Sequence, residues 1–237
     1  MKDRLIVALD VDTFEDACMI VDELSDEVSI YKIGLAPFIG YGFKIIDYLK
    51  SKDKKFFLDL KFFDIPNTVE LAVYQACAMG ASMLTLHTIG AKSMIEAAIN
   101  GKKRYEDKFS KSGALLLGVT ILTSMDQESL TNGMFIEKPI EEVIFSLAKN
   151  AYEVGLRGFV ASPFEAKLLK DKLGDDIVVV TPGIRMDNSK DDQKRASTPR
   201  FAIENKADYI VVGRPIIKAK NPKQAAIDCI KNMKGED

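Results

Sequence analysis

Short apolar runs alternate with segments of helical periodicity along the whole chain. The apolar runs, which we expect to be strands, cover residues 4–10, 30–33, 55–60, 82–87, 114–120, 158–161, 177–180 and 209–212. Apolar residues at helical spacing predict helices at 13–24, 37–51, 65–79, 92–100, 140–154, 163–173, 191–205 and 222–233. The pattern therefore predicts eight strand–helix units in succession.

The strands are almost continuously apolar, which is typical of parallel strands that are covered on both faces. Eight β/α units fit an α/β fold of the closed (β/α)₈ TIM-barrel type, and 237 residues is an ordinary length for it. An open doubly wound sheet is the rival, but no G-x-G-x-x-G follows the first strand. Because no linker or low-complexity segment interrupts the pattern, we expect a single barrel domain over residues 1–237.

The stretch K-K-F-F-L-D-L-K-F-F-D-I-P-N-T, residues 54–68, brings three charged residues to the end of the third strand. Side chains alternate along a strand, so Asp59 and Lys61 point to the same side. Asp64 follows just before the helix that Pro66 can begin. Buried charges are costly unless they pair, and such arrays gather at functional sites. A surface salt-bridge network is the alternative in a chain with 29% charged residues.

Polar residues also end or follow most of the other strands. Active sites of (β/α)₈ barrels lie at the carboxyl ends of the strands, so these residues should meet on one rim. In chain order the set is Asp10, Lys32, Asp59 with Lys61, His87, Thr123 with Ser124, the segment T-P-G-I-R ending in Arg185, and G-R-P from Gly213. Such convergence favours an active site over independent surface charges.

The loops after strands seven and eight predict a phosphate site, a common feature of this fold. Gly213 allows close approach to its backbone N–H, and Arg214 offers a forked donor. The polar segment after Arg185 contains Gln193, a neutral donor that could cover an anion.

Composition excludes several other classes of protein. With 33 basic and 35 acidic residues the net charge is −2, so no broad basic field predicts binding to nucleic acid or to an anionic membrane. Cys18, Cys77 and Cys229 are far apart and lack neighbours at metal spacing, which predicts reduced thiols in a cytoplasmic protein and no zinc site. We find no signal peptide and no apolar run of membrane-spanning length.

The segment D-L-K-F-F-D-I-P-N-T at residues 59–68 resembles the D-x-K-x-x-D-I-P-x-T motif of the orotidine 5′-phosphate decarboxylase family. The likeness extends over essentially the whole chain. It includes A-L-D at 8–10, Y-K-I-G at 31–34, L-T-S-M-D at 122–126, T-P-G-I-R at 181–185, D-D-Q at 191–193 and V-V-G-R-P-I at 211–216. The D-x-K-x-x-D pattern alone is shared with relatives that act on other substrates, so the additional segments carry the assignment.

The resemblance implies conversion of orotidine 5′-monophosphate (OMP) to UMP and carbon dioxide, the last step of de novo UMP synthesis. It implies a (β/α)₈ homodimer that needs neither a metal nor an organic cofactor. Lys61 would donate the proton to C6 of the pyrimidine. Asp59 would lie near the scissile carboxylate, in a charged network with Lys32 and Asp64.

The resemblance also implies how the substrate is held. Asp10 and Lys32 would contact the ribose hydroxyls, and Thr123 would meet the pyrimidine edge. Other contacts would come from the partner subunit and from the phosphate side. The partner would supply Asp64, Ile65 and Thr68; the remaining substrate-binding residues are Pro182, Arg185, Gln193, Gly213 and Arg214.

Three alternatives remain at this point. A magnesium-dependent decarboxylase of a keto-sugar phosphate would resemble this chain at residues 59–64, but it would carry a Glu where this chain has Lys32. A Schiff-base aldolase could use Lys61, although nearby carboxylates would keep that lysine charged. A non-catalytic nucleotide-binding protein would not need the Asp59–Lys61 pair. For His87, the only histidine, we expect a structural or substrate-shaping role rather than catalysis.

Overall fold

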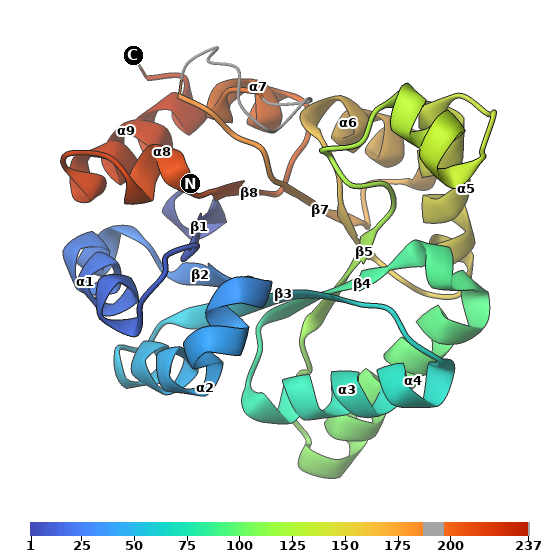
Figure 1. Ribbon diagram of the computed structural model, residues 1–237, viewed down its shortest axis with the longest axis horizontal. Coiled ribbons are helices and arrows are strands. Elements are labelled where there is room, and N and C mark those ends of the chain that lie inside the picture. The colour runs from blue at the N-terminus through green and yellow to red at the C-terminus, as the bar shows by residue number, and fades with distance from the viewer. Residues whose placement is uncertain (187–196, 237) are drawn as a thin grey trace.

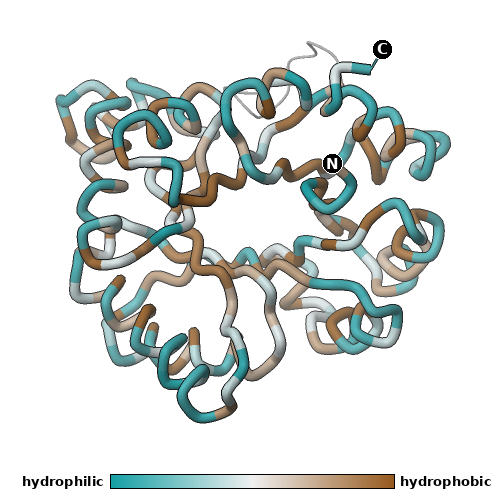
Figure 2. The backbone as a smooth tube through the Cα atoms, turned by 180° about the vertical axis from the view of Figure 1, so that it is seen from behind, coloured by the Kyte–Doolittle hydropathy of each residue, from teal (hydrophilic) through white to brown (hydrophobic). Residues whose placement is uncertain are grey.

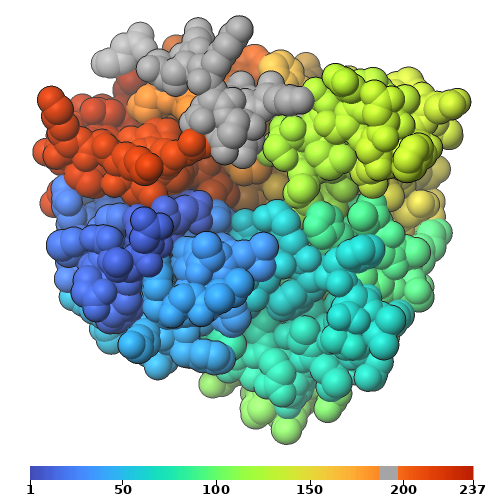
Figure 3. Space-filling model, in the orientation of Figure 1, coloured from blue at the N-terminus to red at the C-terminus, as the bar shows by residue number. Residues whose placement is uncertain are grey.

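Eight parallel strands close on themselves in chain order in the computed structural model, which describes residues 1–186 and 197–236. The strands are β1 (Leu5–Ala8), β2 (Ile30–Ile33), β3 (Lys55–Phe62), β4 (Met83–His87), β5 (Leu115–Val119), β6 (Gly158–Val160), β7 (Val178–Thr181) and β8 (Tyr209–Val212). Pairing of Leu5 in β1 with Ile210 in β8 closes the ring. Figure 3 shows the first and last parts of the chain side by side on the surface. The predicted (β/α)₈ barrel is confirmed.

Helices surround the strands on the outside, as Figure 1 shows. They are α1 (Phe14–Leu24), α2 (Leu35–Ser51), α3 (Pro66–Met79), α4 (Ala91–Phe109), α5 (Ile140–Glu153), α6 (Pro163–Leu173), α7 (Pro199–Glu204), α8 (Arg214–Ile217) and α9 (Pro222–Lys234). Local chemistry sets several of their ends. The Thr13 side chain accepts from the N–H of Asp16 at the start of α1, and α3 begins at Pro66 and ends at Gly80 in the left-handed conformation.

The apolar core has two layers, one inside the barrel and one between the sheet and the helices. The interior is filled by Ile6, Ala8, Ile30, Phe57, Met83, Leu117, Val180 and Val211, so the barrel is a packed core and not a pore. In Figure 2 the backbone is most hydrophobic along the strands and alternates in hydropathy along the outer helices. This arrangement matches helices that bury one face against the sheet.

Several predicted boundaries were wrong for physical reasons. The helix predicted at 92–100 runs on to Phe109 through Gly101, where α3 lies so close that a Cβ would overlap the carbonyl of Glu70. The helix predicted at 191–205 begins only at Pro199, because Ser197 pairs with Ile184 in a β-bridge. Its earlier residues lie outside those described. The short helix α8 was not predicted.

None of the helices in the described part of the chain has the length and apolar character that crossing a bilayer requires.

Candidate active site

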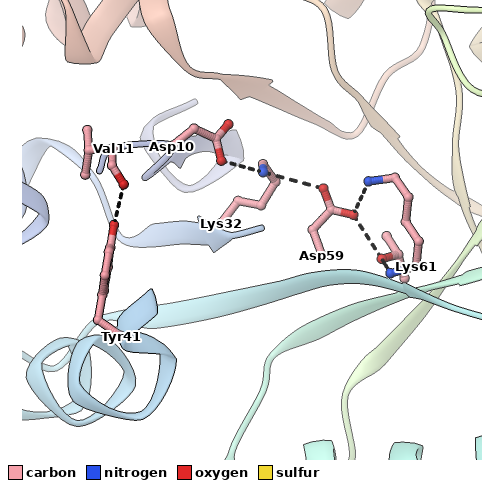
Figure 4. A network of polar contacts seen from close by, with 7 residues as sticks. Asp10, Val11, Lys32, Tyr41, Asp59 and Lys61 are labelled. Carbon is pink, nitrogen blue, oxygen red and sulfur yellow. Dashed lines mark hydrogen bonds and ion pairs between the residues drawn. The ribbon is translucent and has the colours of Figure 1, made fainter. Parts of the chain in front are cut away.

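Four charged side chains form a continuous chain of ion pairs at the carboxyl ends of β1, β2 and β3 (Figure 4). The ammonium of Lys32 lies 3.2 Å from Asp10 Oδ1 and 3.5 Å from Asp59 Oδ2. The ammonium of Lys61 lies 2.9 Å from Asp59 Oδ1. Charges therefore alternate from Asp10 through Lys32 and Asp59 to Lys61.

The strand register explains how Asp10 and Lys32 meet. Ala8 is aligned with Lys32, and the N–H of Leu9 donates to the carbonyl of Lys32, so Asp10 lies directly beyond it. The hydroxyl of Tyr41 in α2 donates to the carbonyl of Val11 at 2.7 Å (Figure 4). This hydrogen bond ties the loop after β1 to α2 and so restrains the segment that carries Asp10.

A bulge in β3 presents Lys61. Leu58 is aligned with Leu84 and Phe62 with Leu86, so four steps along β3 match two along β4. Lys61 has a φ of 50°, a left-handed conformation that costs a residue with a side chain roughly 1–2 kcal/mol. Its N–H donates to Thr85 Oγ1 at 2.9 Å, which helps to hold the conformation. Backbone strain of this kind is typical of functional sites.

Asp59 is the centre of the ion-pair chain, and only 14% of its side chain is exposed. Burial alone would raise the pKa of its carboxyl. The positive charges of Lys32 and Lys61, with hydrogen bonds from Lys61 and Thr85, outweigh burial and hold the pKa of Asp59 below its usual value. Asp59 is therefore an anion at neutral pH.

The ion-pair chain borders a cavity of about 510 Å³, a size typical of small-molecule sites. Nine of the catalytic and substrate-binding residues that the family resemblance implies line it. They are Asp10, Lys32, Asp59, Lys61, Thr123, Pro182, Arg185, Gly213 and Arg214. Apolar side chains that include Val160 and Ile121 complete the wall.

Similarity to known proteins agrees with this geometry. The family model described as "Orotidine 5'-phosphate decarboxylase / HUMPS family" matches residues 3–229. A protein named orotidine 5′-phosphate decarboxylase from Carboxydothermus hydrogenoformans is 45% identical over 236 residues, which span 99% of this chain and 98% of that one. A protein of the same name from Heliobacterium modesticaldum is 39% identical, over 98% of this chain and 96% of its own.

A crystal structure of the protein of that name from Lactobacillus acidophilus superposes with a TM-score of 0.86 at 37% identity. It covers 98% of this chain and 99% of its own. The chain belongs to the orotidine 5′-phosphate decarboxylase / HUMPS family.

Three residues of the family motif lie away from the cavity of their own chain. Asp64, Ile65 and Thr68 are exposed and do not line the cavity. The carboxylate of Asp64 accepts from the N–H of Ile65 at 2.7 Å and takes no part in the ion-pair chain. Within one chain, the expected network therefore contains Asp59 and Lys32 but not Asp64. Gln193, the remaining residue expected from the family, lies outside the described residues.

His87 ends β4 but does not line the cavity. Its ring makes an edge contact with Phe63, with centroids 5.9 Å apart. Burial, and secondarily the charge of Lys61, lower the pKa of His87, while Asp59 opposes the shift. The imidazole is therefore neutral at pH 7.

Sequence reasoning assigned no role to two residues beside the family's charged groups, Lys218 and Gly34. Lys218 lines the cavity one turn beyond Arg214, a spacing that could have been noticed had the short helix α8 been predicted. Gly34 packs against the ion pair at the end of β2. A Cβ there would lie 3.1 Å from Lys32 Nζ and 3.2 Å from Asp10 Oδ1, so a side chain would disturb the pair.

Proposed function

We propose that this protein is an orotidine 5′-monophosphate decarboxylase that forms UMP and carbon dioxide in the last step of de novo UMP synthesis. The observation that carries the proposal is the Lys32–Asp59–Lys61 array, which borders a cavity large enough for a nucleotide. Membership of the family and the names of its close relatives support the same reaction.

The array suits a decarboxylation that has no electron sink. When the bond between C6 and the carboxylate breaks, carbon dioxide leaves and the electron pair remains at C6 in the ring plane. The Lys61 ammonium would stabilise that pair and then transfer its proton to C6, and the resulting amine would regain a proton from solvent. Asp59, ionised between two lysines, would orient Lys61 and face the substrate carboxylate.

The remaining lining residues would hold the nucleotide along its length. Asp10 and Lys32 would meet the ribose hydroxyls, and Thr123 the pyrimidine edge. The phosphate would lie at the opposite end, near the loops after β7 and β8, with contacts from Pro182, Arg185, Gly213, Arg214 and Gln193. Binding energy gained there would position C6 against Lys61.

The alternative of a magnesium-dependent keto-sugar decarboxylase is disfavoured by Lys32. Its ammonium lies between the carboxylates of Asp10 and Asp59, where a metal would otherwise find two oxygen ligands. Among the described residues, no group of three or more His, Cys, Asp or Glu side chains is arranged to hold a metal ion.

The proposed enzyme is a cytoplasmic homodimer with shared active sites. Phe63 and Ile65 expose 58% and 67% of their surface, so two large apolar side chains face solvent beside the motif. Burial of this segment against a second chain would cover them and bring Asp64 and Thr68 to the neighbour's ribose site. The three cysteines are free, which agrees with a reducing compartment.

One assay tests the reaction. Protein treated with a chelator should remove the ultraviolet absorption band of OMP without added metal. Absence of that reaction, together with magnesium-dependent decarboxylation of a keto-sugar phosphate, would replace the proposal by the alternative.

A further inference from the structure

Three basic side chains line the end of the cavity beyond β7 and β8. Arg185 and Arg214 line it, and so does Lys218, which directly follows α8. The N–H of Lys218 donates to the carbonyl of Arg214 at 3.0 Å, so one helical turn sets the spacing between these two residues. Residues four apart on a turn project from the same face, and both of these side chains reach the cavity wall.

The two carboxylates that line the cavity belong to the ion-pair chain at its other side. Asp10 and Asp59 are paired with Lys32 and Lys61, so two anions and two cations cancel formally within the ion-pair chain. The described lining residues include no further carboxylate. Lys218 therefore lines the same end of the cavity as two arginines, and no described carboxylate lines the wall beside it.

Lys218 is exposed and forms no ion pair with another residue in the part of the chain that the structure describes. Elsewhere in this protein a helical lysine pairs with a carboxylate four residues further on, as Lys149 does with Glu153 in α5. An unpaired ammonium on a cavity wall is available to an anionic ligand. A compact ammonium suits this role because it acts as a point charge that needs no fixed orientation.

We propose that Lys218 is a phosphate-recognition residue of the nucleotide site. It adds a third cation to Arg185 and Arg214, increases affinity for the phosphate monoester dianion, and attracts that dianion to the cavity mouth. The proposal rests on the proposed function, which supplies the nucleotide. The role of Lys218 goes beyond the proposed function because the last segment shared with the family ends at residue 216.

The test compares Lys218→Gln with Lys220→Gln. Lys220 is an exposed lysine two residues further on that does not line the cavity, so it controls for the loss of one surface charge. Binding of UMP and of uridine, which lacks the phosphate, is measured by calorimetry at low and at moderate salt. We expect Lys218→Gln to weaken UMP binding about 3- to 10-fold, equivalent to about 0.7–1.4 kcal/mol, and to change uridine binding less than about twofold.

The salt dependence of UMP binding should also become shallower in Lys218→Gln, because one screened cation is lost. Lys220→Gln should match wild type for both ligands, and Lys218→Arg should restore most of the affinity for UMP. The proposal is overturned if the two Gln variants behave alike, or if Lys218→Gln weakens uridine as much as UMP.

The readout is separate from catalysis. A wild-type protein that binds UMP through Lys218 but leaves OMP intact would refute the proposed reaction and support the phosphate role. A wild-type protein that decarboxylates OMP but binds UMP independently of Lys218 would support the proposed reaction and refute the phosphate role of Lys218.

Discussion

Replacing Lys61 by Ala tests the proposed chemistry most directly. Lys61 is the ammonium at the open end of the ion-pair chain, with about a third of its side chain exposed. Lys32, by contrast, is 12% exposed and lies between two carboxylates. Of the two lysines beside Asp59, Lys61 is therefore the one that is free to approach a substrate atom.

The expected loss follows from the two roles assigned to this ammonium. At about 3.5 Å from a developing carbanion, and with an effective dielectric constant of about 20, its Coulomb stabilisation is about 4.7 kcal/mol. That corresponds to between three and four powers of ten in rate. Loss of a positioned proton donor typically costs a further factor of about 10²–10⁴. Because one group serves both roles the losses are not simply additive, so we expect kcat to fall by at least about 10⁴-fold.

The assay is the initial rate of loss of OMP absorbance under saturating substrate. The control is Lys55→Ala, which removes an exposed lysine from the start of the same strand, far from the cavity, and should retain wild-type activity. Thermal unfolding and UMP binding check that Lys61→Ala is folded and keeps its phosphate site. A folded Lys61→Ala protein that retains a tenth of the wild-type rate would refute the assignment of Lys61 as proton donor.

Three further predictions address binding, pH dependence and subunit sharing. Arg214→Ala should weaken UMP binding at least tenfold and leave uridine binding nearly unchanged in calorimetry; equal weakening would indicate a structural role. The pKa of Asp59 is lowered by folding, so its ion pairs stabilise the protein above the ordinary Asp pKa of about 4 and are lost as the pH falls through the lower folded value. The difference in urea-unfolding free energy between wild type and Asp59→Asn should thus be flat from about pH 5 to 8 and shrink below about pH 4; a difference that varied across the neutral range would contradict it. Mixing Asp64→Ala with Lys61→Ala under conditions of chain exchange should restore about a quarter of wild-type activity, because half of the sites lie in heterodimers and half of those are intact. Continued inactivity despite demonstrated exchange would show that Asp64 serves its own chain.

The barrel itself could be predicted because its signal is repeated eight times. Each buried strand is a short apolar run, and each helix shows its own period, so an error at one boundary leaves the topology unchanged. The same strand order predicted that the polar residues at the carboxyl ends of the strands would meet on one rim. Asp10 and Lys32 were predicted to share a rim, and their side chains are 3.2 Å apart.

The geometry of β3 could not be predicted from alternation alone. A regular strand would also place Asp59 and Lys61 on one face, but the structure pairs them across a bulge with Lys61 in a left-handed conformation. The bulge depends on how β3 aligns with β4 and on the Thr85 hydroxyl, which lies 24 residues further along the chain. Lys218 escaped notice for a related reason, because the four-residue helix α8 is too short to produce a periodic pattern.

The exposure of the segment from Asp64 to Thr68 is not explained by the structure of a single chain. Within one chain it has no packing reason to combine an apolar residue that is 67% exposed with a carboxylate that bonds only to the next residue's N–H. Complete burial of Ile65, of which 67% is exposed, would be favourable by roughly 1–2 kcal/mol, so its exposure costs a single chain about that much. A second copy of the chain would remove that cost and supply the ribose contact in a single step. The exposure of Ile65 beside Asp64 therefore supports the proposed shared site, which the chain-exchange experiment tests.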